Sequence, residues 1–559
     1  MESSRGPSKG QIVRALIETA DLEEVVSDNP FRSRAFRAAA RTIDAWSGDF
    51  ARAVESGELT SIQGIGKGIA DFVTEMWTTG ASARHEELRE LVPPGVRRML
   101  DVPGLGPKKV RTLWRELKIE SIDALKEACS EGRVAKLKGF GKKTAENILA
   151  GIGYLESVGG RYLLPEAEAV ASQICEYLRS GPPIEKLEVA GSLRRRRETV
   201  RDLDVLAVTS DPQALSDHFI HFTEVETVIA QGDTKTSVRL VNGMAVDLRI
   251  VKRSQFPFAL VYFTGSKEHN VRLRSRAKDR GLKLNEYGLF PDGSARSKRC
   301  ADEKAIYRAL DLDWIPPELR EDLGEIEAAE QGAVPRLLEA REIQGIVHAH
   351  TTWSDGKATL EDLARAVKAA GYSYLGISDH SQSAFYAGGL DPDRVRAQHE
   401  EIDRLSEELE GFRIFKGIES DIRADGSLDY SDDVLESFDF VIASLHSHFH
   451  LPEEEQTARV LRALESPYTT ILGHATTRLL LRREGVELDL DRVLVRAAEL
   501  GVAIEINANP YRLDIDWRYG PRARELGVYT SINPDAHSLP EIGYVRFGVD
   551  MARKAGWPP

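Results

Sequence analysis

The chain has 559 residues, 42% of them hydrophobic, and this length predicts about three to five globular domains rather than a disordered protein. Its start lacks the apolar core of a signal peptide, and no stretch approaches the roughly 18 apolar residues of a membrane span. The three cysteines form no disulfide or metal pattern, so we expect a cytoplasmic protein without a membrane partner. The net charge of −14 conceals a division, because residues 1–300 carry +6 and residues 301–559 carry −20. Nucleic-acid binding by the first part is therefore not excluded.

Three similar turns occur in the first 160 residues: SIQGIGKGIA (61–70), DVPGLGPKKV (101–110) and LKGFGKKTAE (137–146). Each places two glycines before a helix-like segment, where backbone N–H groups and the helix dipole favour an anion. One such turn is as easily structural as functional, but three in similar context favour DNA phosphates as ligands. They resemble helix-hairpin-helix elements, which grip DNA without reading its sequence. The candidate DNA-binding residues are Gly64, Gly66, Lys67, Gly104, Gly106, Lys108, Gly139 and Gly141.

The segment VAGSLRRRRETVRDLDVLAV (189–208) places Asp202 and Asp204 two apart on an apolar run. The period of a strand puts both carboxylates on one face, and GMAVDLRIV (243–251) supplies Asp247 on a second strand. Three carboxylates from adjacent strands can hold two Mg²⁺ ions for in-line attack on phosphorus. An Asp-x-Asp pair alone is often a strand edge. With Gly191-Ser192 and the arginines close by, we interpret the three as catalytic residues of a nucleotidyltransferase palm, which this region resembles.

The segment ALVYFTGSKEHNVRLRSRAKDRGLKLNEYGLF (259–290) resembles the nucleotide-binding part of family X DNA polymerases. The residues that this resemblance assigns to the incoming nucleotide and template are Gly191, Ser192, Arg195, Tyr262, Phe263, Gly265, Asn270 and Arg274. Among them, Arg195 would hold the triphosphate as a charged donor fork. Lys267 is either a further contact to the nucleotide or a solvated lysine, and the sequence leaves both open.

One departure from the family has a chemical consequence. Members with 5′-deoxyribose phosphate lyase activity carry a nucleophilic lysine on the helix after the first hairpin, where this chain has Phe72. Lys67 is near but lies in the turn, where contact with phosphate is its expected role. We therefore expect weak or no lyase activity through this site.

Residues 311–342 are acidic, contain Pro316-Pro317, and read as a linker with a helix. Seven apolar runs follow, and six of them deliver a metal-ligand residue type. Strands separated by helix-length segments predict β/α units that place these residues at one end of a barrel. A single histidine there is usually a satisfied core residue, but six of the 13 histidines fall at these positions. The candidate ligands are His348, His350, Asp355, His380, Glu419, His446, His474, Asp535 and His537.

Imidazole and carboxylate ligands suit Zn, Mn or Fe. The motifs HAH, SDH, GIES, SLH, GH and PDAH resemble the PHP (polymerase and histidinol phosphatase) domain. This resemblance implies a distorted (β/α)7 barrel with up to three ions, Mn²⁺ or Zn²⁺, that hydrolyses phosphate esters. The chain departs from this family in two ways. Where the family usually has a proline and small residues after the fifth histidine, this chain has GHATTRLLLRREG. The chain also stops at Pro559, earlier than the resemblance implies, so we expect a closing helix to be missing.

The order of these regions resembles the family X DNA polymerases of bacteria and archaea over essentially the whole chain. We expect a multidomain α/β and α+β protein. Its expected parts are an N-terminal helical domain with a helix-hairpin-helix (1–90), a second helix-hairpin-helix DNA-binding domain (91–160), a palm (161–255), a nucleotide-binding subdomain (256–310), the linker (311–342) and a PHP domain (343–559).

The sequence thus predicts a monomeric, nucleoid-associated repair polymerase that uses Mg²⁺ and dNTPs to fill gapped or primer-template DNA. Its barrel would act as a 3′→5′ exonuclease or 3′-phosphoesterase. Three alternatives stay open: a barrel that is only a metal-stabilised scaffold, a small-molecule phosphatase with a DNA-binding arm, and a non-enzymatic DNA-binding adaptor. The carboxylate sets and the hairpins weigh against all three.

Overall fold

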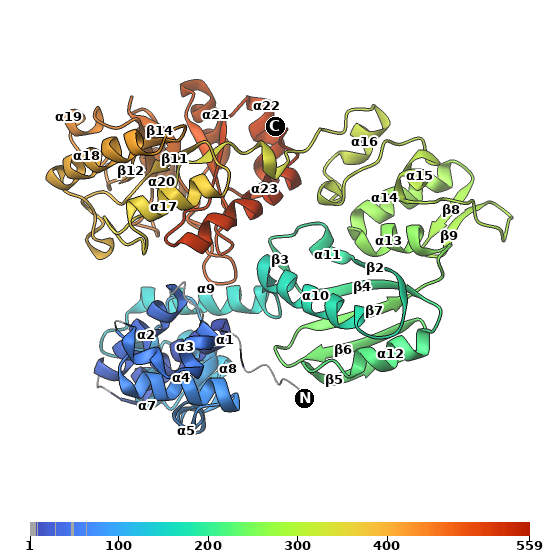
Figure 1. The fold of residues 1–559 in the computed structure, drawn as a ribbon, viewed down its shortest axis with the longest axis horizontal. Coiled ribbons are helices and arrows are strands. Elements are labelled where there is room, and N and C mark those ends of the chain that lie inside the picture. The colour runs from blue at the N-terminus through green and yellow to red at the C-terminus, as the bar shows by residue number, and fades with distance from the viewer. Residues whose placement is uncertain (1–6, 8, 28–29, 46–49, 63, 559) are drawn as a thin grey trace. The chain divides into compact units, whose positions relative to one another are not determined.

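The computed structural model describes residues 7, 9–27, 30–45, 50–62 and 64–558. It divides into two compact units, residues 1–159 and 160–559 (Figure 1). Within the described ranges, no helix combines the length and the apolarity that crossing a membrane requires.

The first unit consists of helices, drawn in blue to cyan in Figure 1. They are α1 (Lys9–Val26), α2 (Pro30–Ala45), α3 (Phe50–Glu55), η1 (Glu58–Ser61), α4 (Lys67–Thr79), α5 (Ala83–Leu91), α6 (Pro94–Met99), α7 (Pro107–Leu117), α8 (Ile122–Ser130), η2 (Val134–Lys136) and α9 (Lys142–Val158). Two cores form around opposite ends of α1. Ile12 and Leu16 pack with α2 to α4, whereas Leu22 and Val25 pack with α5 to α9.

The three glycine turns adopt one geometry. The first glycine of each, Gly64, Gly104 or Gly139, has a positive φ, between 77° and 92°. The second glycine is the extended N-cap of the following helix, α4, α7 or α9. Only glycine adopts the first conformation without strain, and the turn leaves the N–H groups of the helix start open to an anion.

The second unit begins with a five-stranded sheet of order β2-β4-β7-β6-β5, in which β4 and β7 are parallel neighbours. The elements of this region are β1 (Tyr162–Leu163), α10 (Leu164–Arg179), β2 (Ile184–Val189), α11 (Gly191–Arg194), β3 (Thr199–Val200), β4 (Asp202–Thr209), α12 (Pro212–Ile220), β5 (Val225–Ala230), β6 (Lys235–Leu240) and β7 (Ala245–Ile250), and β1 and β3 form a separate two-stranded sheet. Alternate residues of β4 face opposite sides: Val205 packs with α10 and α12, while Leu206 packs against Phe256 and Leu260 of the next helix.

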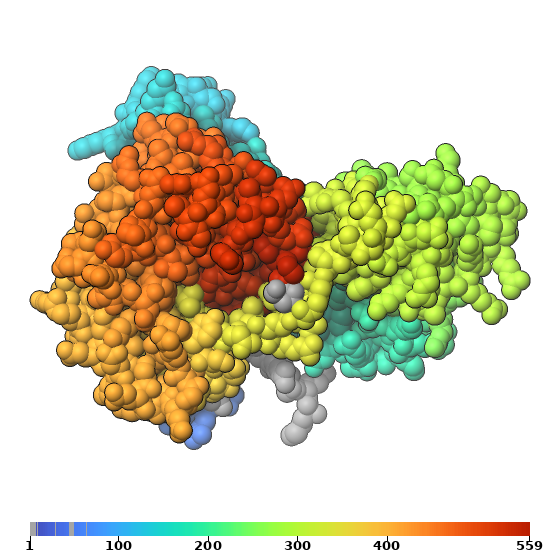
Figure 2. All heavy atoms as spheres, turned by 90° about the horizontal axis from the view of Figure 1, so that it is seen from above, coloured from blue at the N-terminus to red at the C-terminus, as the bar shows by residue number. Residues whose placement is uncertain are grey.

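The following subdomain comprises α13 (Phe256–Thr264), α14 (Lys267–Asp279), β8 (Leu282–Asn285), β9 (Gly288–Pro291), α15 (Glu303–Arg308), η3 (Pro317–Leu319), α16 (Glu325–Glu330) and η4 (Ala340–Glu342). Much of segment 311–342 packs into it, since Ile315 and Ile326 share its hydrophobic core. Glu325 of α16 also lies 2.7 Å from Nδ1 of the buried His269 in α14. Figure 2 shows the rest of this segment, in yellow, running on to the barrel.

The last region is a seven-stranded parallel sheet in chain order, β10 to β16. A bridge between Ala349 and Ala536 joins the ends and nearly closes the barrel. The seven predicted strands are thereby confirmed. The strands are β10 (Gly345–Ile346), β11 (Tyr374–Ile377), β12 (Arg413–Asp421), β13 (Phe440–Ser444), β14 (Thr469–Leu472), β15 (Ala503–Asn507) and β16 (Thr530–Asn533).

Helices surround these strands, and strand residues such as Ile377, Ile418 and Ile442 are fully buried because both faces of a parallel sheet are covered. The helices are α17 (Leu360–Ala369), η5 (Phe385–Ala387), α18 (Pro392–Glu408), α19 (Asp432–Leu435), α20 (Glu453–Leu464), α21 (Leu490–Leu500), η6 (Trp517–Tyr519), α22 (Gly520–Leu526), η7 (Leu539–Tyr544) and α23 (Val545–Lys554). The expectation of a missing closing helix was wrong, because α23 follows the last strand and contacts both β15 and β16.

Candidate functional site

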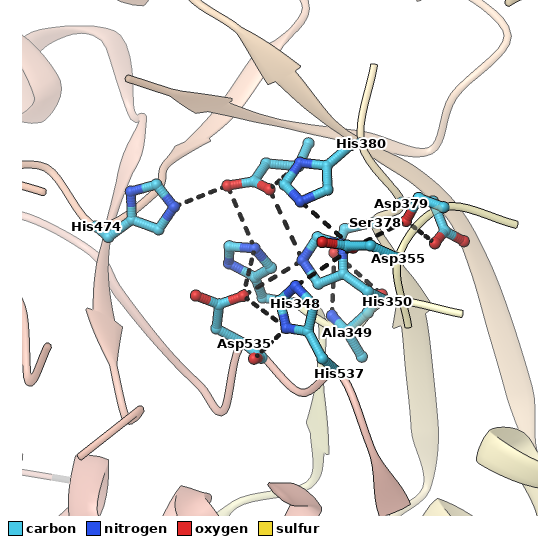
Figure 3. Close-up of polar contacts among 12 residues, drawn as sticks. His348, Ala349, His350, Asp355, Ser378, Asp379, His380, His474, Asp535 and His537 are labelled. Atoms are coloured by element: carbon cyan, nitrogen blue, oxygen red, sulfur yellow. Dashed lines mark hydrogen bonds and ion pairs between the residues drawn. The ribbon is translucent and has the colours of Figure 1, made fainter. Parts of the chain in front are cut away.

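The nine predicted ligands lie at the carboxyl end of the barrel strands. Seven of them follow their strand by two to four residues, Asp355 lies further along the loop after β10, and Glu419 lies within β12, a strand that continues to Asp421. Figure 3 shows His348, His350, His380 and His537 directed into one space with the acidic side chains between them. Successive β/α units bring these side chains together because parallel strands end at the same edge.

Glu419 lies at the centre of this cluster. One of its oxygens is 2.9 Å from Nδ1 of His380, and the other is 2.8 Å from Nε2 of His474 and 3.2 Å from Nε2 of His446. All four side chains are nearly buried. A single carboxylate therefore faces three imidazoles from three different loops.

Asp535 and Asp355 complete the acidic part of the cluster. Asp535 Oδ1 lies 3.3 Å from Nε2 of His350 and 3.5 Å from Nε2 of His348. Asp355 Oδ1 lies 3.4 Å from Nε2 of His537. The cluster thus alternates imidazoles and carboxylates around one space.

The geometry of this cluster fits divalent metal ions. Within the described residues, four overlapping groups offer ligand atoms no more than 4.8 Å apart, and together they contain all nine predicted ligands. Both ring nitrogens of His350 and Nε2 of His348 are buried without a hydrogen-bond partner. Burial of such groups is costly unless something binds them, and imidazole nitrogen beside carboxylate oxygen is the donor set of Zn²⁺ and Mn²⁺ sites.

Against the effect of burial, neighbouring carboxylates raise the pKa of His348, His446 and His537, whereas the pKa values of two other predicted ligands shift towards the forms that bind metal. Burial, with the neighbouring imidazoles of His537 and His380, lowers the pKa of His350 to about 3, so this ring is neutral and able to donate a lone pair. Burial opposes ionisation of Glu419, but the surrounding imidazoles, led by His446, hold its pKa well below the usual range. A neutral imidazole and a charged carboxylate are the forms that bind metal.

Two carboxylates behind the ligands were missed by the sequence reasoning. Glu505 of β15 lies 2.6 Å from Nδ1 of His348 and accepts the backbone N–H of His474 at 2.8 Å. Asp421 lies 2.6 Å from Nδ1 of His446. Such partners fix the orientation of a metal-binding imidazole. A signal existed for Glu505, because a carboxylate in the middle of the apolar run VAIEINA must find a buried partner.

The five-stranded sheet carries the second cluster of carboxylates. Asp204 and Asp247 are register partners on the parallel strands β4 and β7. Asp247 is 2.8 Å from Nζ of Lys235 and 2.6 Å from the Ser237 hydroxyl. Burial, with repulsion from Asp202, raises the pKa of Asp204 to about 6, as expected where carboxylates are crowded together.

Gly191 is required by this arrangement. It has a φ of +64°, and a Cβ atom there would lie 2.7 Å from Oδ2 of Asp204. Any other residue would strain the backbone and push against the carboxylate. The next predicted residue, Ser192, follows on the short helix α11 and is half-buried.

Several predicted nucleotide-binding residues meet beside this helix. Arg195 donates to the carbonyl of Thr264 at 2.6 Å, and Asn270 Nδ2 donates to the carbonyl of Tyr262 at 2.7 Å. Gly265 lies between the two side chains, since a Cβ atom there would be 3.5 Å from Arg195 and 3.6 Å from Asn270. Two segments about 70 residues apart in the sequence therefore form one polar corner.

The remaining predicted residues lie around this corner or in the first unit. The ring of Phe263 packs edge-on to Tyr262 and lies under the guanidinium of Arg249. Lys267 and Arg274 are exposed on α14. In the first unit, Phe72 is 4% exposed and packs edge-on against Phe36, so this position holds a core residue.

Comparisons with protein families cover both units. A helix-hairpin-helix domain matches residues 7–82, and a SAM-like helix-hairpin-helix tandem matches residues 96–153. The DNA polymerase beta thumb matches residues 259–321, and the PHP domain matches residues 347–509.

Comparisons with individual proteins add relatives of both halves. The chain is 41% identical to "DNA polymerase/3'-5' exonuclease PolX" of Bacillus subtilis, over 98% of this chain and 96% of that protein. It is 24% identical to DNA polymerase lambda of Arabidopsis thaliana, over 47% of this chain and 53% of that one. A "Probable phosphatase" of Thermoanaerobacter sp. is 29% identical over 37% of this chain and 85% of its own length.

Proposed function

The chain belongs to the PolX family of DNA polymerases that carry a PHP domain, and we propose that it fills short gaps in DNA with its palm and trims 3′ ends with its barrel. The observation that carries this proposal is the presence of two separate acidic centres, one on β4 and β7 and one inside the barrel. A phosphodiester bond can be made at the first and hydrolysed at the second.

In the palm, Asp202, Asp204 and Asp247 would hold Mg²⁺, which when bound stabilises charge on the attacking and leaving oxygens of phosphorus. The chain's own residues orient the nucleotide. Arg195 would bind the triphosphate as a charged fork, and Gly191 lets the chain pass close to the carboxylates.

Tyr262, Phe263 and Gly265 would pack beneath the deoxyribose, Asn270 would meet the base, and Ser192 would bind phosphate. Arg274 would reach the template, and Lys267, exposed at the start of α14, would contact the nucleotide or remain solvated. The polymer substrate would be gapped or primer-template DNA, gripped by the three glycine turns of the first unit. We further propose that the protein acts as a monomer at the nucleoid in the cytoplasm.

In the barrel, the nine ligands would hold up to three Mn²⁺ or Zn²⁺ ions, which when bound activate water and polarise the phosphate. Glu505 and Asp421 would fix the ring orientation of His348 and His446. Arg512, whose Nε lies 3.5 Å from Oδ2 of Asp535, would meet a non-bridging phosphate oxygen at the edge of the cluster.

The test uses a labelled primer in a one-nucleotide gap, with Mg²⁺ or Mn²⁺ and with or without dNTPs. The double variant Asp202→Ala, Asp204→Ala should lose extension and keep shortening, whereas His348→Ala should lose shortening and keep extension. If both activities vanish in either variant, the two centres do not act separately. If the wild type never shortens the primer, the barrel is a scaffold or acts on another substrate.

A phosphomonoesterase activity of the barrel is the second candidate, favoured by its similarity to a named phosphatase. A primer that ends in a 3′-phosphate distinguishes the two. Release of inorganic phosphate that is lost in His348→Ala supports this activity, and an unreactive end excludes it.

A further inference from the structure

The loop after β11 presents two aromatic side chains to solvent at the mouth of the barrel. Phe385 is 89% exposed and Tyr386 is 74% exposed, although both belong to the ordered turn η5. The ring centre of Tyr386 lies 6.4 Å from that of His380, a predicted metal ligand. Neighbouring exposed aromatic side chains are unfavourable in water, and in folded proteins such patches commonly mark a binding site.

This loop is held in place rather than loosely attached. Asp429 accepts the backbone N–H of Ser383 at 2.7 Å, and Arg394 donates to the carbonyl of Gly388 at 2.7 Å. Hydrogen bonds therefore fix the loop on both sides of the aromatic pair. Both rings stay exposed although the loop that carries them is held on either side.

Across the strand ends, the loop after β14 carries two arginines that stack on aromatic rings of two neighbouring loops. The Arg482 guanidinium lies 4.7 Å from the ring centre of Tyr511, and that of Arg483 lies 4.6 Å from the ring centre of Phe449. Arg482 and Arg483 belong to the segment GHATTRLLLRREG that departs from the expected pattern. Positive charge at the mouth of an otherwise acidic barrel would attract an anionic ligand.

We propose that this mouth binds the single-stranded 3′ end of DNA, with its last bases stacked on Phe385 and Tyr386 and its phosphates facing Arg482 and Arg512. Aromatic rings that stack with any base, together with cations along the backbone, are how proteins bind single strands without reading sequence. The inference rests on the proposed trimming function, and it adds how the strand end is held beside the metal ligands.

The test measures binding separately from cleavage. The full-length protein in EDTA is titrated into a single-stranded oligonucleotide that carries 2-aminopurine as its 3′-terminal base, whose fluorescence falls on stacking. We expect Phe385→Ala with Tyr386→Ala to raise Kd about tenfold and weaken the quenching. Phe385→Tyr and Tyr386→Phe, which keep the rings, should bind like wild type. The matched control is Tyr529→Ala, since Tyr529 is 72% exposed but precedes β16 at the opposite end of the strands.

A second oligonucleotide, abasic at its last two positions and labelled further along the strand, should bind wild type and the alanine variant equally. If wild type and the alanine variant quench the 2-aminopurine fluorescence equally, the bases do not stack on Phe385 and Tyr386 and the proposal is overturned. It is also overturned if sedimentation shows that wild type is a dimer and that the alanine variant is a monomer, because the two rings would then form a dimer interface. Cleavage with Mn²⁺ then separates the two ideas. If the alanine substitutions weaken quenching but wild type does not shorten the strand, stacking on Phe385 and Tyr386 is supported and the trimming function is rejected. If wild type shortens the strand but the alanine substitutions leave quenching unchanged, trimming is supported and the stacking is rejected.

Discussion

The partner of His348 determines which of its ring nitrogens can face a metal ion. Glu505 occupies Nδ1 and also accepts from the backbone of His474 and from Asn507 and Asn533. Nε2 is left facing Glu419 and Asp535. Glu505 is therefore a positioning residue, which would orient His348 towards a bound metal ion.

Glu505→Gln should weaken metal binding by about 10- to 100-fold, because an amide is a poorer partner for the ring than a carboxylate. The affinity is measured by competition with a chromophoric chelator, which does not depend on catalysis. Glu499→Gln, an exposed position on α21, is the matched control and should leave the affinity unchanged. An unchanged affinity in Glu505→Gln would show that the ligands are oriented without it.

A second residue-scale prediction concerns Gly191. Gly191→Ala should reduce primer extension about 100-fold, because the added Cβ lies 2.7 Å from Oδ2 of Asp204 and displaces a carboxylate. Shortening by the barrel should be unaffected. Gly232→Ala provides the control, since a Cβ there makes only an ordinary contact of 3.6 Å. Full extension by Gly191→Ala would mean that Asp204 is not needed in its present position.

At the scale of elements, the glycine turns act through the starts of α4, α7 and α9. Their shared backbone geometry turns N–H groups outward at three places in the first unit. Lysines beside these turns add attraction for phosphate, which is sensitive to salt.

Lys108→Gln should weaken binding of gapped DNA equally for all sequences and reduce the slope of log K against log salt by about 1, because one phosphate contact is lost. Fluorescence anisotropy at several salt concentrations measures both. Lys126→Gln is the control, since Lys126 lies on α8 and pairs with Glu156 instead. A similar loss in both variants would assign the effect to net charge rather than to the turn.

At the scale of the whole second unit, the palm loop that carries the arginines is tied to the end of the barrel. Trp517 donates to Glu198 at 2.9 Å, and the buried Lys554 of α23 donates to Glu321 at 2.6 Å. Glu321 in turn accepts from Arg195, the predicted triphosphate ligand. The barrel thus supports the palm in addition to any chemistry of its own.

Glu198→Gln should lower the stability of this unit by about 2–3 kcal/mol at pH 7. Burial alone would favour the neutral acid, but Arg197, Arg518 and Arg478 lower the pKa of Glu198 to about 2, below its ordinary value of 4.5. Its contribution is therefore present above pH 4.5 and is lost as the pH falls towards 2. Urea unfolding from pH 7 to pH 3 should show wild type and variant converging.

The matched control for this prediction is Glu185→Gln, which removes an exposed pair with Arg253 and should cost less than about 1 kcal/mol at any pH. A constant difference between wild type and Glu198→Gln across the whole pH range would contradict the assignment, because it would place the effect in packing rather than in charge.

The sequence by itself predicted the nine candidate ligands, and it determined the strands that carry them and the family. Six histidines at the ends of apolar runs, and carboxylates two apart on a strand, are local patterns set by the periods of secondary structure. Only the tertiary structure showed which side chains hydrogen-bond to the predicted site residues and hold them in position. Glu505 reaches His348 across 157 positions, and Lys554 meets Glu321 across 233. Such contacts depend on barrel closure and on packing between distant segments, which leave no periodic trace along the chain.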